Sequence, residues 1–250
     1  MLEHDVLVVG GGLAGLRAAL EAQNDGANVA IITKVHPVRS HSNAAQGGIN
    51  AALTDRGDTW EEHAYETVKG SDYLGDQDAI EVLAEEAGRA IIDMEHMGVI
   101  FSRNEDGQLG TRNFGGQQRA RTFFVADFTG QAMLHVMYEQ IMKAGTRVYE
   151  EWFVSSLIME NGECHGVVAI EMISGKTQLI KAKAVIMASG GLGRLYEPTT
   201  NALICTGDGI ALSYNVGAPL IDMEMVQYHP TTLKSNGVLI TEAARGEGAY

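Results

Sequence analysis

A glycine-rich turn near the start of the chain limits the folds that this sequence can adopt more than any other feature. The continuous apolar run at residues 5–9 (DVLVV) is typical of a buried parallel strand. Gly10, Gly12 and Gly15 follow it with the spacing G-x-G-x-x-G, and an amphipathic helical pattern comes next. Residues 28–33 (NVAIIT) predict a second buried strand. The order of strand, turn, helix and strand predicts the start of a doubly wound α/β domain.

The three glycines have distinct roles in this Rossmann-like pattern. Gly10 permits the tight turn, Gly12 lets a pyrophosphate approach the backbone, and Gly15 lets the helix pack against the strand. The first helical turn offers free N–H groups and a partial positive charge to the phosphates. We therefore predict a dinucleotide cofactor, rather than a glycine-rich turn with no ligand. The predicted contact residues are Gly10, Gly11, Gly12, Leu13, Ala14 and Gly15.

One residue that usually accompanies such a loop is missing. An acidic residue that binds the ribose hydroxyls is expected at the end of the second strand, where Thr33 and Lys34 stand instead. A threonine hydroxyl can still bond to a ribose, so both residues remain predicted cofactor contacts. Ordinary NAD recognition is correspondingly disfavoured.

Residues 76–97 predict an amphipathic helix. Its first turn contains Asp78 and Glu81, which are spaced as an N-terminal capping pair. The apolar residues recur at helical spacing and predict one buried face. That face comprises Ile80, Leu83, Ala87, Ile91, Met94 and Met97.

Two strands joined by a tight turn are predicted in the second half of the chain. Residues 163–171 and 177–188 alternate or run apolar, and Ser174–Gly175 marks the turn between them. A helix that begins at Thr129 precedes these strands.

The composition excludes several kinds of partner. The net charge is −14, from 18 lysines and arginines against 32 aspartates and glutamates, with no basic cluster. Nucleic acid and anionic membrane surfaces are therefore not expected as direct partners. Cys164 and Cys205 lie far apart without a CxxC pair, which predicts neither a disulfide framework nor a metal site. No apolar run reaches the ~18 residues of a membrane span, so we expect a cytoplasmic location.

The loop after the second predicted strand carries a histidine among small polar residues. Residues 33–53 (TKVHPVRSHSNAAQGGINAAL) resemble the flavin loop of succinate dehydrogenase and fumarate reductase flavoprotein subunits. In that family the histidine of R-S-H-[ST]-x-x-[AG]-[QE]-G-G carries FAD through a bond to the 8α-methyl carbon, and His41 is the matching residue. A neutral imidazole nitrogen can form such a bond, whereas His41 taken alone would be an ordinary loop residue. The resemblance assigns further cofactor contacts to Ser40, Ser42, Ala45, Gln46, Gly47 and Gly48.

The resemblance extends over essentially the whole chain. The segments that match in family order are VKGSDYLGDQDAIE, FGGQ, ADFTGQAMLH, ASGGLGRLY, TTNALICTGDGIAL, DMEMVQYHPT and LITEAARGEG. The ASGG turn resembles a second glycine loop close to the cofactor. Asp208 in TGDG matches a family FAD contact, and its alternative role is to cap the helix that follows it.

The resemblance also assigns substrate and proton-transfer residues. In the family the histidine of HPT and the threonine before the glutamate bind a carboxylate of the dicarboxylate substrate, and here these are His229 and Thr241. Both side chains can donate hydrogen bonds to a carboxylate. Glu242 and Arg245 match a proton relay, although their spacing also suits a surface ion pair.

Other residues of the family's active site have no counterpart in this sequence. The family's catalytic base is an arginine further downstream, and family members are much longer. The resemblance therefore implies an N-terminal portion that is inactive alone. It comprises an FAD-binding domain over residues 1–227, without its C-terminal return segment, and the start of an α+β capping domain over residues 228–250.

For the intact protein, the resemblance implies interconversion of succinate and fumarate by hydride transfer to covalently bound FAD. Electrons would pass through an iron–sulfur subunit to quinone in a membrane anchor. The protein would then be cytoplasmic and peripheral on the inner face of the cell membrane. The preferred direction of the reaction stays open.

Two alternatives compete with this interpretation. L-aspartate oxidase has a similar A-Q-G-G loop and a similar ending, but it binds FAD non-covalently and lacks the histidine at the position of His41. The other alternative is an FAD-binding module without catalytic activity.

Overall fold

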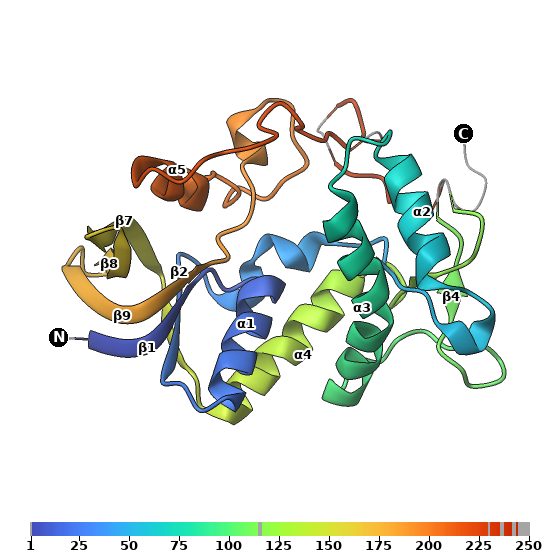
Figure 1. Cartoon of the computed structure of the whole chain (residues 1–250), viewed down its shortest axis with the longest axis horizontal. Helices are drawn as coiled ribbons and strands as arrows, with labels where there is room; N and C mark the ends of the chain where they lie inside the picture. The colour runs from blue at the N-terminus through green and yellow to red at the C-terminus, as the bar shows by residue number, and fades with distance from the viewer. Residues whose placement is uncertain (1, 115–116, 230, 236–237, 242–243, 245–250) are drawn as a thin grey trace. The chain divides into compact units, whose positions relative to one another are not determined.

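The computed structural model describes residues 2–114, 117–229, 231–235, 238–241 and 244. The chain forms two compact units, one of residues 1–44 with 134–238 and one of residues 45–133 with 239–250 (Figure 1). This division into compact units does not test the predicted boundary between an FAD-binding domain and a capping domain after residue 227, which stays a prediction.

The first unit is built on a mixed six-stranded sheet. Its strands are β1 (Leu2–Val9), β2 (Val29–Thr33), β6 (Arg147–Glu150), β7 (Trp152–Glu160), β8 (Glu163–Glu171) and β9 (Thr177–Met187). They lie in the order β6-β2-β1-β9-β8-β7. β1 pairs in parallel with β2 and β9, and β2 pairs in parallel with β6, while β8 is antiparallel to both of its neighbours. The predicted α/β class is confirmed.

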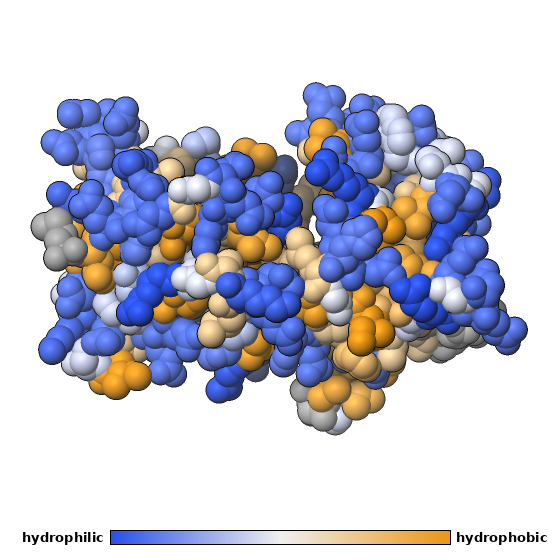
Figure 2. Space-filling model, turned by 90° about the horizontal axis from the view of Figure 1, so that it is seen from below, coloured by the Kyte–Doolittle hydropathy of each residue, from blue (hydrophilic) through white to orange (hydrophobic). Residues whose placement is uncertain are grey.

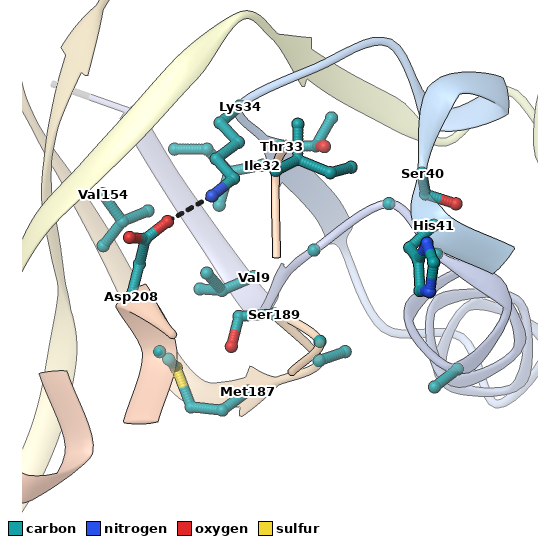
Figure 3. A pocket seen from close by; sticks show the side chains of 18 of the residues that line it. Val9, Ile32, Thr33, Lys34, Ser40, His41, Val154, Met187, Ser189 and Asp208 are labelled. Carbon is teal, nitrogen blue, oxygen red and sulfur yellow. Dashed lines mark hydrogen bonds and ion pairs between the residues drawn. The ribbon is translucent and has the colours of Figure 1, made fainter. Parts of the chain in front are cut away.

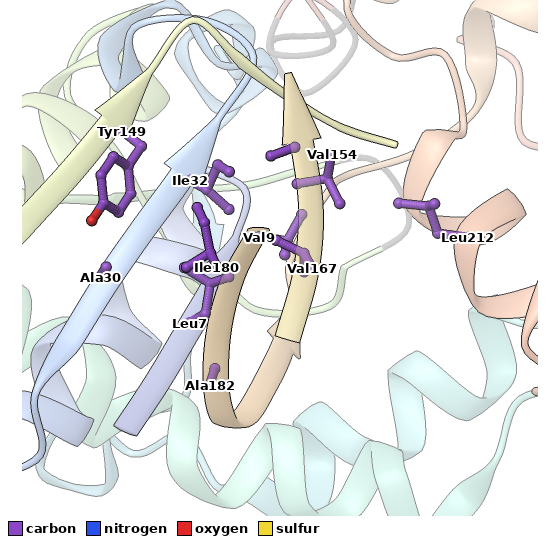
Figure 4. Packing of buried hydrophobic residues seen from close by; sticks show 11 residues of the cluster. Leu7, Val9, Ala30, Ile32, Tyr149, Val154, Val167, Ile180, Ala182 and Leu212 are labelled. Atoms are coloured by element: carbon purple, nitrogen blue, oxygen red, sulfur yellow. The ribbon is translucent and has the colours of Figure 1, made fainter. Parts of the chain in front are cut away.

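The hydrophobic core of this unit lies along the middle of the sheet (Figure 4). All five residues of β2 are buried, as expected for a central parallel strand. Leu7 and Ile180 have no exposed surface. In the parallel pairing of β1 with β9, Leu7 lies opposite Val185. Helix α1 (Leu13–Asn24) begins directly after Gly12, which confirms the predicted order of strand, turn and helix. Its buried residues are Gly15, Leu16, Ala19 and Leu20.

Short turns and helices complete the first unit. The predicted hairpin between β8 and β9 is confirmed, and Gly175 in its turn has a φ of +70°. The other elements are η1 (Pro37–Arg39), η2 (His41–Ala44), η4 (Gly193–Leu195) and α5 (Asp208–Asn215). Helix α4 (Thr129–Ala144) begins at the predicted residue; its residues from 134 onward belong to the first unit and those before belong to the second.

The second unit combines two helices with a small antiparallel sheet. Its elements are β3 (Ile49–Asn50), η3 (Thr54–Arg56), α2 (Trp60–Gly70), α3 (Gln77–Met97), β4 (Thr111–Arg112) and β5 (Thr122–Phe123). The three strands lie in the order β3-β5-β4. β3 therefore connects the end of the histidine loop to this sheet.

The predicted position of helix α3 is confirmed, its predicted cap is wrong, and its predicted buried face is right at Ile91 and Met94 but wrong at Leu83. Asp76 is the N-cap and its side chain accepts from the Ala79 N–H at 3.2 Å, so the capping pair of Asp78 and Glu81 is wrong. Leu83 is 58% exposed. The buried residues are Ala84, Gly88, Ile91 and Met94. Gly88 is small because the backbone comes close: a Cβ there would lie 2.8 Å from the Ala52 carbonyl oxygen.

The face of the molecule in Figure 2 is largely hydrophilic, with smaller hydrophobic patches between. Within the described parts of the chain, no helix is long and apolar enough to cross a membrane. The same residues contain no group of three or more histidines, cysteines or carboxylates that could hold a metal ion.

Candidate functional site

A cavity of about 470 Å³ lies in the first unit, at the carboxyl ends of β1, β2 and β9 (Figure 3). This edge of a doubly wound sheet is where nucleotide ligands bind. Most of the predicted cofactor residues of this unit meet there. The predicted residues that line the cavity are Gly10, Gly11, Gly12, Leu13, Ala14, Thr33, Lys34, Ser40, His41, Ser42 and Asp208.

The glycine loop has the geometry that its sequence predicts. Gly10 has a φ of +121°, and a Cβ there would lie 2.1 Å from the Ala188 carbonyl oxygen. A Cβ on Gly15 would lie 2.0 Å from the Gly10 carbonyl oxygen, so this glycine lets α1 pack against the loop. Gly12 is the N-cap of α1 and supplies no side-chain cap. The start of the helix therefore faces the cavity as a site for an anionic group.

The serines of the histidine loop lie beside Gly12. A Cβ on Gly12 would be 3.2 Å from Ser42 Oγ and 3.7 Å from Ser40 Oγ. Ser42 Oγ accepts from the Leu13 N–H at 3.2 Å. Ser40 Oγ is buried, and among the described residues it has no hydrogen-bond partner. A buried hydroxyl without a partner is costly, so a polar ligand in the cavity fits this position.

His41 begins η2 and is half-buried in the cavity wall. Its Nδ1 accepts a hydrogen bond from the Ala202 N–H at 3.3 Å. Burial lowers the pKa of His41 below its ordinary value. The imidazole is therefore mainly neutral at pH 7, which is the form that can act as a nucleophile.

A carboxylate from another part of the chain lies where the sequence lacks an acid at the end of the second strand. Lys34 forms an ion pair with Asp208 and donates to Thr206 Oγ1 at 2.6 Å. Thr206 Oγ1 in turn donates to the Asp208 carboxylate at 2.9 Å. The Thr33 hydroxyl donates to the Val35 carbonyl at 2.8 Å. A carboxylate therefore does lie at the end of β2, but the first residue of α5 supplies it.

The alternative role of Asp208 as a helix cap is wrong. The N-cap of α5 is Gly207, and no side-chain cap is present. In Figure 3 Lys34 and Asp208 meet at one side of the cavity, while Ser40 and His41 lie at the other. The cavity thus has a charged end and a histidine end.

Several lining residues were not among the predicted site residues. Trp152, Phe153 and Val154 of β7 contribute to the wall, and so does Cys205, whose pKa burial raises. Their sequence has no motif that marks a binding role. Ser189 also lines the cavity, within the ASGG turn that was expected to lie close to a cofactor.

The rest of the predicted loop belongs to the second unit. Arg112 donates to the carbonyl oxygens of Gln46, at 3.3 Å, and of Gly47. Ala45 accepts from the Gly130 N–H at 2.8 Å. The glycine pair is closely packed: a Cβ on Gly47 would be 2.7 Å from the Phe114 ring, and one on Gly48 would be 2.5 Å from the Phe123 carbonyl oxygen. Packing alone thus requires glycine at position 48, where the contact is with backbone, whereas at Gly47 the Phe114 ring would have to shift.

The predicted substrate residues are divided between the two units. His229 of the first unit lines a separate cavity of about 130 Å³ together with Thr199 and Asn201. Thr241 belongs to the second unit. Glu242 and Arg245, the predicted relay, lie outside the described residues.

Comparisons with known proteins agree with this geometry. Residues 5–250 match the family model of the FAD binding domain. The chain is 51% identical over 257 residues to a succinate dehydrogenase flavoprotein subunit of Rickettsia bellii, and 47% identical over 251 residues to a fumarate reductase flavoprotein subunit of Mycobacterium tuberculosis. A solved structure of E. coli quinol fumarate reductase superimposes with a TM-score of 0.95 at 42% identity. Each match covers 99% of this chain and 43% of the relative.

The fold, the glycine loop and the family match together define an FAD-binding protein, and the chain belongs to the FAD-binding-domain family. Within that family it corresponds to the N-terminal portion of succinate dehydrogenase and fumarate reductase flavoprotein subunits. It spans less than half of their length.

Proposed function

We propose that this chain is the cofactor-carrying portion of a flavoprotein subunit that interconverts succinate and fumarate. The observation that carries the proposal is the cavity that gathers the glycine loop, Ser40, His41 and Asp208. The orphaned Ser40 hydroxyl and the uncapped start of α1 fit a bound dinucleotide. The adenosine ribose would lie toward Lys34 and Asp208, and the flavin toward His41.

We propose that His41 holds FAD through a covalent bond at Nε2. The Ala202 N–H occupies the lone pair of Nδ1, which directs the other ring nitrogen to the cofactor. A ring linked to the cofactor through Nε2 would keep the Nδ1 lone pair that accepts from the Ala202 N–H. The hydrogen bond therefore suits the linked form of the ring. Bound FAD would supply the hydride-accepting chemistry.

The substrate roles proposed for this chain belong to residues near its end. His229 and Thr241 would donate hydrogen bonds to one carboxylate of the dicarboxylate, which orients the carbon that gives up hydride. His229 Nδ1 lies 2.9 Å from the carbonyl oxygen of Thr231 and 3.3 Å from its backbone nitrogen, so Nε2 is the ring nitrogen that would face the substrate. Glu242 and Arg245 would relay a proton to an arginine base further along a longer protein.

The proposed partners follow from the similarity of the chain to succinate dehydrogenase and fumarate reductase flavoprotein subunits. An iron–sulfur subunit would take electrons from the flavin and pass them to quinone in a membrane anchor. The subunit would then be cytoplasmic and peripheral on the inner face of the membrane. Nothing in the composition favours a nucleic acid partner.

The covalent bond gives the sharpest test of this function. We expect the protein, denatured in acid and run on a gel, to keep a fluorescent flavin, because an 8α bond survives unfolding. Free FAD in the supernatant would refute the covalent bond and favour the aspartate oxidase alternative.

We expect succinate-dependent dye reduction from the full-length protein and none from these 250 residues alone. Flavin retention without dye reduction by the full-length protein would favour the module without catalytic activity.

Asp208→Asn is expected to weaken FAD binding about tenfold or more. The change removes a charged hydrogen-bond acceptor and leaves the Lys34 ammonium without its ion pair. The dissociation constant should be measured by flavin fluorescence in a His41→Ala background, where attachment cannot trap the ligand. Glu163→Gln, an exposed carboxylate in the β7–β8 hairpin, is the matched control and should bind as the parent does. Equal affinity of the Asp208 variant and the control would remove Asp208 from the site.

A further inference from the structure

A second cavity, of about 260 Å³, lies in the second unit and is rich in arginine. Its walls contain three arginines and one carboxylate, although acidic residues outnumber basic ones in the chain as a whole. The lining residues are Ala51, Leu53, Arg56, Asp58, Thr111, Arg119, Ala120, Arg121 and Phe123.

This cavity lies on one particular face of the small sheet. Thr111, Phe123 and Ile49 are cross-strand partners, so their side chains share a face, and the first two line the cavity. Arg112 comes next along β4 and points to the opposite face, where it holds the Gln46 and Gly47 carbonyls. The cavity and the cofactor loop therefore use opposite faces of the same strands.

Two of the three arginines form ion pairs with acidic side chains. Arg121 is 1% exposed, and it binds both Asp58 oxygens at 2.8 and 2.9 Å and Glu66 at 2.9 Å. Arg119 binds Glu62 at 2.6 Å. These ion pairs balance the charge of both guanidinium groups, so neither requires a ligand.

Arg56 is different because its charge has no acidic partner. Its Nη1 donates to the Leu109 carbonyl, and the guanidinium lies 5.6 Å from the centre of the Phe123 ring. Across the described residues Arg56 makes no ion pair, and its buried Nε has no hydrogen-bond partner. A buried donor left without an acceptor destabilises the folded protein. An oxyanion in the cavity would supply the opposite charge that Arg56 lacks.

We propose that this cavity binds a small oxyanion, a carboxylate or a phosphate group, through the guanidinium of Arg56. The planar guanidinium presents its donors in a fork that matches either group. The Thr111 side chain lines the same wall and offers a hydroxyl. The ligand would rest against the strands whose other face holds Gln46 and Gly47, so its binding would stiffen the support of the cofactor loop. The site itself does not depend on the function proposed above.

Calorimetric titration of the FAD-loaded chain with inorganic phosphate and with acetate tests this proposal, with chloride at matched ionic strength as the blank. Saturable binding of either probe is expected, at least tenfold weaker in Arg56→Gln and intermediate in Arg56→Lys, which keeps the charge without the fork. Arg89→Gln is the matched control, because Arg89 is an exposed arginine of α3 in the same unit. It should bind as the parent does.

Two outcomes would overturn the proposal. One is the absence of saturable binding of both probes to the parent. The other is equal binding by the parent and Arg56→Gln, which would place the anion elsewhere, for example at the glycine loop. If the chain fails to load FAD, the proposed cofactor role fails, but the same titrations of the unloaded chain still decide the role of Arg56.

Discussion

His41→Ala is expected to abolish covalent attachment of flavin completely. The ring is half-buried in the cavity wall, its Nδ1 is held by the Ala202 N–H, and burial keeps it neutral at pH 7. Alanine has no nucleophile, and no other histidine lines this cavity among the described residues. Flavin fluorescence on an acid-denatured gel should fall to background, while the folded variant still binds FAD reversibly.

Ser42→Ala is the control for this change. It alters the neighbouring residue of η2 and removes a hydrogen bond to Leu13 N–H, but it leaves the imidazole in place. Attached flavin should therefore persist in this variant. Flavin that remains attached in His41→Ala would show that another residue carries it. Loss of the fold in His41→Ala, seen by circular dichroism, would instead make the histidine structural.

Gly10→Ala is expected to destabilise the first unit by about 3 kcal/mol and to prevent FAD binding. An alanine there must adopt a φ of +121°, a sparsely populated conformation that costs on the order of 1–3 kcal/mol. Its Cβ would also lie 2.1 Å from the Ala188 carbonyl oxygen, so β9 and the loop must separate. Both the free energy of unfolding, from urea denaturation, and FAD affinity should fall together.

Gly26→Ala separates the two causes. Gly26 also has a positive φ, +88°, but a Cβ there meets nothing within 4 Å. Only the conformational cost of about 1–2 kcal/mol should appear, and FAD binding should be retained. If Gly10→Ala were no more harmful than Gly26→Ala, the close approach of Ala188 would not be what requires glycine.

The features that the sequence predicted correctly depend on residues close together in the chain. The glycine loop, helix α1 and the β8–β9 hairpin each follow from local spacing and turn chemistry. The predicted buried face of α3 included the exposed Leu83 and omitted Ala84 and Gly88. The prediction counted large apolar residues, whereas these two buried residues are small and a hydropathy pattern scores them weakly.

The parts of the site that were missed depend on residues far apart in the chain. Lys34 and Asp208 are 174 positions apart, so the expected ribose acid looked absent when only the end of β2 was considered. The resemblance to a family did point to Asp208, but not to its ion pair with Lys34. The charge network around Arg121 joins residues up to 63 positions apart, and no motif marks it.

The pairing of β1 between β2 and β9 also sets an order of assembly during synthesis. β2 follows β1 within a few dozen residues, whereas the other neighbour, β9, begins at Thr177. At roughly 5–20 residues per second, a ribosome needs on the order of ten seconds or more to deliver that strand. Until then one edge of β1 has no strand paired with it and could pair with other segments. The Ala188 backbone that packs against Gly10 has also not yet been synthesised. The nucleotide cavity is therefore a late product of folding, and cofactor loading must wait for most of the first unit to leave the ribosome.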